Sequence, residues 1–336
     1  MFRYATLVLL IFCLTQKINA KPSSGLTSES FLGKPVGARF VGVGLAGVSL
    51  PGTPESPVYN PASLSDVKVS AFSIDTEVAN QSRLAQEVVF SQSSLRDKKL
   101  TYLGFAGSNR AIFYRPLTNF DETVVTSTSA PSTNYKRNDV QVNQFGISAS
   151  QTAEKGYDVG LTVSYLNARR GYMEVADGQA PILEMANGNG FSVDWGFRDT
   201  QGPLAYGLSL LNLPGILYWD EYKKDQLPTT VRAGFTFQPT PTFAFITEYE
   251  KRFYVNDKTD PDFWHFGVDV LPLRWLSLRG GAESEDFNNQ NKTAYTWGVA
   301  TSSAKGLTLD IASRARQILE ERVYEYYLTL TWPLPS

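Results

Sequence analysis

The sequence predicts an all-β protein, a 14-stranded antiparallel transmembrane β-barrel, and three observations support this. From Asp139 to the C-terminus, apolar and polar residues alternate in stretches of about ten to fourteen residues, which is the length of a tilted strand that crosses a membrane. No stretch of 18 apolar residues exists, which argues against helical spans. The connections between the expected strands are alternately long and short, as in outer-membrane barrels.

The first 20 residues have the pattern of a cleaved secretory signal. Arg3 supplies the positive region, Ala5–Leu14 the short apolar region and Ile18–Ala20 the cleavage site. We therefore expect three parts: a signal peptide (1–20), an N-terminal hatch segment (21–65) inside the lumen, and the barrel (66–336).

The composition narrows the class of protein further. Cys13 is the only cysteine, so the mature chain would contain no disulfide. Removal of Arg3 and Lys17 leaves 29 basic residues against 33 acidic ones, a balance that argues against nucleic-acid binding. The mean hydropathy of −0.21 is expected for a barrel, because only alternate residues of each strand face lipid.

Alternation of apolar and polar residues locates the individual strands. In residues 158–167, Val159, Leu161 and Val163 alternate with small or polar neighbours, as expected for a strand with one wet face. The same pattern predicts fourteen strands: 67–75, 98–107, 111–119, 139–150, 157–170, 187–198, 203–212, 228–238, 242–253, 262–271, 275–285, 292–302, 306–316 and 322–333. We assign a fifteenth candidate, Leu84–Ser94, to a loop, because single-chain bacterial barrels have even strand numbers.

The lengths of the connections set the orientation. Short turns such as Gly107–Arg110, Pro239–Pro241 and Pro272–Leu273 follow the even-numbered strands and belong on the periplasmic side. The other connections are longer and belong at the cell surface: 76–97, 120–138, 171–186, 213–227, 254–261, 286–291 and 317–321.

The two strand faces differ in chemistry. The face assigned to lipid is rich in aromatic residues, several of them at strand ends where interfacial girdles lie, such as Trp195, Phe237, Trp264, Trp297 and Trp332. The other face carries charges of both signs, which predicts cross-strand ion pairs inside the barrel. Its candidate site residues are Arg115, Arg232, Glu248, Glu250, Arg252, His265, Asp269, Arg279, Glu283, Asp310 and Arg314. They either form a charged path for a substrate or a structural network, and the second reading is favoured because barrel interiors need polar residues in any case.

We expect neither catalysis nor a metal or other cofactor. His265 is the only histidine, whereas a metal site normally uses several histidines or acidic ligands. A Ser-His-acid hydrolase would have to use His265 with Asp269 near it on the same face, and no serine motif marks a nucleophile.

Residues 33–65 do not alternate, and they carry a glycine-rich stretch followed by a turn element. The glycines suit close backbone approach or positive φ, and Asn60–Ala62 suits a rigid turn in which Pro61 fixes φ. The candidate hatch residues are Gly37, Arg39, Gly42, Gly44, Gly47, Asn60, Pro61 and Ala62.

The stretch VGARFVGVGLAGVSLPGTPESPVYNPASLS resembles the N-terminal signature of the FadL-type outer-membrane transport proteins. The segments LPTTVRAGFTFQPT and FWHFGVDVLPLRWLSLRGGAES are similar to strands of its divergent members. The resemblance implies a fourteen-stranded barrel with an internal hatch that ligand binding displaces, and lateral release of a fatty acid or aromatic hydrocarbon into the bilayer. It also implies that residues 76–97 and 120–138 help to form an outer capture site.

Two functions remain open at this point. The first is passive transport of a hydrophobic small molecule across the outer membrane, which needs an apolar pocket next to the hatch and a head-group partner such as Arg115 or Arg232. The second is a docking role in protein secretion, as in a related branch of the superfamily. In that case a secreted-protein partner would bind a patch on residues 120–138, 171–186 and 213–227. In both cases outer-membrane lipids surround the barrel.

Overall fold

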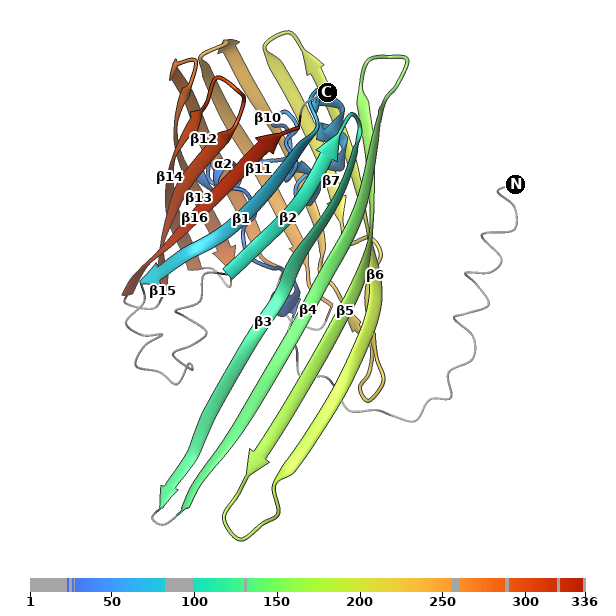
Figure 1. Ribbon diagram of the computed structural model, residues 1–336, viewed down its shortest axis with the longest axis vertical. Coiled ribbons are helices and arrows are strands. Elements are labelled where there is room, and N and C mark those ends of the chain that lie inside the picture. The colour runs from blue at the N-terminus through green and yellow to red at the C-terminus, as the bar shows by residue number, and fades with distance from the viewer. Residues whose placement is uncertain are drawn as a thin grey trace, which may run out of the picture.

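A computed structural model shows one antiparallel sheet that closes on itself (Figure 1). It describes residues 23, 26, 28–81, 99–129, 132–255, 260–287, 290–318 and 321–334. Most strands pair with their neighbours in the chain, and pairing of the first strand with the last closes the ring. The predicted all-β barrel is therefore confirmed.

The sheet contains sixteen strands. Their bounds are β1 Ala71–Gln81, β2 Lys99–Gly107, β3 Arg110–Ser129, β4 Ser132–Thr152, β5 Asp158–Val175, β6 Ile182–Gln201, β7 Leu204–Leu211, β8 Gly215–Trp219, β9 Asp225–Gln226, β10 Thr229–Thr240, β11 Phe243–Phe253, β12 Asp262–Leu273, β13 Leu276–Phe287, β14 Gln290–Ser302, β15 Thr308–Ile318 and β16 Glu321–Pro333.

Two of these strands are continuations rather than separate wall positions. β7 and β8 both pair with β6 in the same direction, and they are separated only by residues 212–214. Across this break, Leu213 N–H donates to Val193 O and Val193 N–H donates to Pro214 O. β9 likewise precedes β10 and pairs with β8. The wall therefore has the fourteen strand positions that the sequence predicts.

Strands β3 to β6 are much longer than predicted. They contain 18 to 21 residues, whereas about 9–11 residues cross a bilayer. The expected loops 120–138 and 171–186 are wrong, since most of their residues continue these strands as a projection below the rest of the barrel in Figure 1. Their Ser, Thr and Asn residues hide the strand pattern because a sheet wet on both faces needs no alternation.

Smaller differences concern single elements. The first strand begins at Ala71 rather than at residue 67, because Pro61–Asp66 forms a 3₁₀ helix, η3, just before it. The predicted loop 213–227 contains β8 and β9. The candidate strand Leu84–Ser94 and the signal peptide 1–20 lie outside the described residues.

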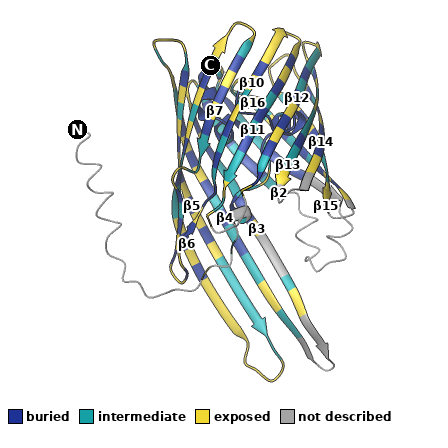
Figure 2. Cartoon of the chain, turned by 180° about the vertical axis from the view of Figure 1, so that it is seen from behind, coloured by how far each residue is buried: buried dark blue, intermediate teal, exposed yellow. Residues whose placement is uncertain are grey.

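The two faces of the wall separate as alternation predicts (Figure 2). Trp195, Trp264 and Trp297 are about half exposed on the outer face, whereas Thr162, Glu248 and His265 are buried on the inner one. The short turns gather at the end of the barrel that is uppermost in Figure 1, hereafter the turn end. The projection of β3 to β6 marks the opposite, loop end.

Residues 28–67, hereafter the internal segment, contain short helices: η1 Ser28–Phe31, α2 Ala38–Gly42, η2 Ser56–Val58 and η3. Backbone groups of the segment bond to inward side chains of β10, β11, β14 and β16, and the Asn60 side chain donates to Phe197 O of β6, so the segment lies inside the ring. Within the described part of the chain, no helix has the length and apolarity needed to cross a membrane.

Candidate functional site in the barrel interior

The glycine-rich part of the internal segment makes a tight turn. Gly37 precedes α2 with φ 78°, and Gly44 follows it with φ 71°, a conformation that side chains disfavour. A Cβ on Gly44 would lie 2.5 Å from Phe266 O, and one on Gly47 2.7 Å from the Tyr59 ring. The turn therefore packs its backbone directly against the wall.

Glycines in the wall match this turn from the other side. A Cβ on Gly281 of β13 would lie 2.4 Å from Gly44 N, and one on Gly207 of β7 2.1 Å from Val48 O. Gly267 similarly faces Val43. The sequence analysis missed these wall glycines, although they interrupt the polar inner face of their strands.

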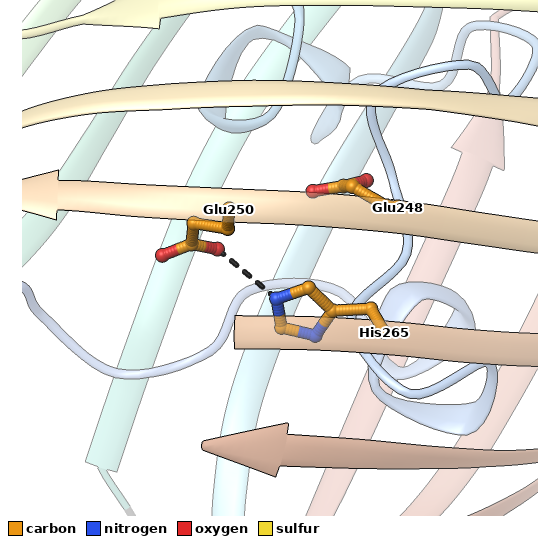
Figure 3. Close-up of side chains that lie close together, drawn as sticks. All are labelled: Glu248, Glu250 and His265. Atoms are coloured by element: carbon orange, nitrogen blue, oxygen red, sulfur yellow. Dashed lines mark hydrogen bonds and ion pairs between the residues drawn. The ribbon is translucent and has the colours of Figure 1, made fainter. Parts of the chain in front are cut away.

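Four linked side chains on β10 to β12 lie at this turn, and we call them the clamp: Arg232, Glu248, Glu250 and His265. Figure 3 shows the last three. Arg232 Nη2 donates to Leu45 O at 3.0 Å. Val48 N–H donates to Glu248 Oε2 at 2.7 Å. His265 Nδ1 donates to Gly44 O at 2.8 Å, because a carbonyl oxygen can only accept. Three successive wall strands thus bind the backbone of one turn.

Glu248, Glu250 and His265 also present ligand atoms within 4.8 Å of one another, as a metal site would. Their bonding partners give a different account of the cluster. Arg232 contacts both carboxylates, Arg252 contacts Glu250, and His265 Nε2 lies 3.2 Å from Glu250. Because two guanidinium groups already balance the two carboxylates, we interpret the cluster as a structural clamp.

The clamp predicts a strong dependence of stability on Arg232. Arg232→Met should leave two buried carboxylates without their shared cation and lower the free energy of unfolding by about 3–5 kcal/mol. Urea unfolding of the refolded barrel, followed by gel mobility, measures this. Arg169→Met is the control, because the Arg169–Asp139 pair is exposed and should contribute at most about 1 kcal/mol. Equal losses in both variants would contradict the clamp.

Two further inward arginines also form ion pairs on the wall. Arg279 contacts Asp269 and Asp310, and Arg314 contacts Glu283 and Glu325. Asp269 thus binds Arg279 and Ser277, whereas the acid beside His265 is Glu250. Asp269 lies on the same inner face as His265 but four residues along the strand, at the level of Arg279.

The Asn-Pro-Ala element is the second fixed point of the internal segment. Asn60 is fully buried; its Oδ1 accepts from Ala62 N–H, and its Nδ2 donates to Val48 O and to Phe197 O of the wall. Pro61 occupies the first turn of η3, where its missing N–H costs nothing. Gly160 and Gly196 on β5 and β6 leave room for this turn.

An apolar cluster lies beyond the fixed turns, toward the loop end. Its side chains come from β3 to β6, from β8 and from the residues around β9, and Phe31 of η1 is buried among them. The members are Phe31, Leu117, Val140, Val142, Leu166, Ala168, Ala186, Leu217, Trp219, Tyr222 and Leu227. The sequence analysis did not find this cluster, because half of it comes from expected loops.

Arg115 lies beside this cluster on β3. Its Nε donates to Gln144 Oε1, and among the described residues no carboxylate oxygen lies within 4.0 Å of its guanidinium group. Part of its side chain is exposed. Arg232, the other expected head-group partner, is fully engaged in the clamp. Arg39 of the segment donates to Pro51 O instead of binding a wall carboxylate.

The wall is interrupted next to Arg115. The β2–β3 ladder ends at the pair Leu103–Tyr114, although β3 continues for fifteen residues beyond Tyr114. The β3–β4 ladder has a bulge between Pro116 and Thr118, where Pro116 cannot donate a backbone hydrogen bond. Over the described residues, β3 has no partner on its β2 side from Arg115 onward.

Several solved structures have a fold similar to that of this chain. The Ralstonia pickettii toluene transporter TbuX is similar over 90% of this chain and 98% of its own, with a TM-score of 0.62 and 13% identity. A Pseudomonas aeruginosa FadL homologue gives a TM-score of 0.66 at 8% identity over 90% and 99% of the two chains. The Pseudomonas putida toluene transporter TodX gives a TM-score of 0.60 at 12% identity, over 90% of this chain and 98% of its own. No protein-family model and no curated protein matches the sequence.

Proposed function

We propose that this chain is a divergent FadL-type outer-membrane protein that transports hydrophobic small molecules passively. The observation that carries the proposal is the apolar cluster inside the barrel toward the loop end, which Phe31 of the internal segment joins. The similar solved structures include toluene transporters and a FadL homologue, which supports a hydrocarbon or fatty acid as the ligand class.

The internal segment acts in this proposal as the hatch that the sequence predicted. A ligand that binds better when the segment is displaced shifts the equilibrium toward the open state. Its displacement must break the hydrogen bonds at Gly44, Leu45, Val48 and Asn60, so only part of the segment moves freely. The unpaired side of β3 beside Arg115 offers a lateral exit toward the bilayer.

Arg115 is the proposed partner of an anionic head group. Arg115→Gln should weaken binding of laurate about tenfold, because one charge-assisted contact is lost, and should leave binding of 1-dodecanol unchanged. Equilibrium dialysis with the purified barrel measures both constants. Arg110→Gln, an exposed residue of the same strand, is the control. Equal effects on acid and alcohol would contradict a head-group role.

Mass spectrometry of small molecules that co-purify with the protein tests the proposal most directly. We expect fatty acids or other hydrophobic compounds to be retained by the wild-type protein and lost when Leu166 and Leu217 of the cluster are replaced by Asn. Repeated recovery of a secreted protein without any hydrophobic ligand would contradict transport.

A docking role in protein secretion is the second candidate, because the projection of β3 to β6 exposes apolar side chains. Leu183 is 70% exposed and Met185 58%, and Met173 of β5 pairs with Leu183. These residues lie beyond the tyrosine and phenylalanine row of Tyr114, Phe145 and Tyr165, so lipid does not account for them. Loss of a secreted substrate from the cell surface in a Leu183→Ser variant would favour this function.

A further inference from the structure

The wall binds different parts of the internal segment through different kinds of contact. The wall binds residues 42–49 and 60–62 through the contacts described above, and these two stretches flank Pro51–Val58, hereafter the lobe. Two wall hydroxyl groups reach the lobe: Tyr102 of β2 donates to Pro54 O, and Ser73 of β1 donates to Glu55 Oε1. The lobe is thus held to the wall by side-chain hydroxyl groups, whereas guanidinium, carboxylate and imidazole groups of the clamp hold the preceding turn.

Glu55 of the lobe faces a second acid across this contact. Glu55 is 3% exposed and Asp75 of β1 is 2% exposed. Asp75 lies on the same face of β1 as Ser73, two residues along the strand, and the charges of the two carboxyl groups act on each other. Two buried carboxyl groups thus lie where the lobe contacts the wall.

No cation neutralises this pair directly. Among the described residues, no Lys, Arg or His nitrogen lies within 4.0 Å of either carboxyl group. Arg39 of α2 and Asp310 of β15 act on the pair from a greater distance with opposite sign, and Tyr102 of β2 adds a neutral hydroxyl. The arrangement differs from the clamp, in which every carboxylate has a guanidinium partner.

Burial without a counter-charge favours the neutral form of a carboxyl group. Burial is the main cause that raises the pKa of Glu55, and hydrogen bonds from Ser73, from Thr53 and from a backbone N–H partly oppose this. When the lobe moves away, both groups regain water and ionise at their ordinary pH. The closed state of the lobe therefore binds more protons than the open state. Its stability relative to the open state falls as the pH rises through the range above pH 4.5.

We propose that Glu55 and Asp75 form a proton-dependent latch, which holds the lobe against β1 and β2 in its neutral form and releases it as the pH rises. Tyr102 connects the latch to the wall beside the place where the β2–β3 ladder ends. Release frees Pro54 from Tyr102 and so uncovers the inner side of this interruption. The inference rests on the proposed gating by the internal segment.

Single-channel recording at about pH 5 and about pH 8 tests the latch. We expect openings of the wild-type barrel to become at least about tenfold more frequent at the higher pH, since release of one proton changes the closed–open equilibrium up to about tenfold per pH unit. Glu55→Gln and Asp75→Asn should each remove most of this dependence. Glu174→Gln is the matched control, because bonds from Tyr172 and Lys136 hold the pKa of this exposed carboxyl below its ordinary value.

Pulsed electron paramagnetic resonance gives a second readout that needs no conductance. Spin labels on Pro51→Cys, an exposed position of the lobe, and on Lys305→Cys of an exposed turn should show a wider distance distribution at the higher pH. A distribution that does not change, or a Glu55→Gln variant that retains the wild-type pH response, would overturn the latch. Neither readout uses a hydrophobic ligand, so failure of ligand binding would contradict the proposed function and leave the latch standing.

Discussion

Deletion of Gly33–Leu64 is expected to turn the barrel into an open pore. The deletion removes the clamped turn, the lobe and the Asn-Pro-Ala element, and leaves a fourteen-stranded wall lined by charged side chains. A barrel of this size is wide enough for water once its interior is emptied. Conductance across a planar bilayer should rise on the order of tenfold.

The control for this deletion removes chain outside the wall. Residues 177–179 form an exposed turn at the tip of the β5–β6 hairpin, and their deletion should leave conductance unchanged. Both variants must show the gel-mobility shift of a folded barrel before they are compared. An unchanged conductance in a folded Gly33–Leu64 deletion would show that the internal segment does not close the pore.

Much of the wall could be predicted because each strand has one lipid face. Alternation assigned Trp195, Trp264 and Trp297 outward and Arg232, Glu248 and His265 inward, and the structure places them so. This works because a strand repeats every two residues whatever its partner is. The turn element at Asn60–Ala62 was visible for a similar reason, since its geometry follows from local residue chemistry.

The remaining features depend on contacts between residues far apart in the sequence. The strands of the projection lie in water on both faces, so they carry no alternation to reveal them. The partners of an inward charge depend on register: Arg232 meets Glu250 because the two residues pair directly across β10 and β11. Glu55 and Asp75 meet only because the lobe folds back onto β1, and no local pattern predicts that.

The second large effect concerns two adjacent glycines of β13 that face opposite sides of the wall. Gly281→Val should displace the Gly44 turn, because its Cβ would lie 2.4 Å from Gly44 N and 2.6 Å from Val43 C. These are backbone atoms in a turn held by His265 and Thr296, so they cannot yield locally. We expect conductance to rise toward that of the deletion variant.

Gly280→Val is the matched control, since a Cβ there meets nothing within 4 Å and points toward lipid. Both variants add the same β-branched residue to the same strand, so any change in strand propensity is shared. The difference between them reports only on the contact with the internal segment. If both variants conduct like the wild type, the wall glycines are not what seats the turn. If only Gly281→Val opens the pore, the ion pairs of the clamp are not sufficient to keep the segment in place. The close packing of the Gly44 turn against the wall glycines is then also required.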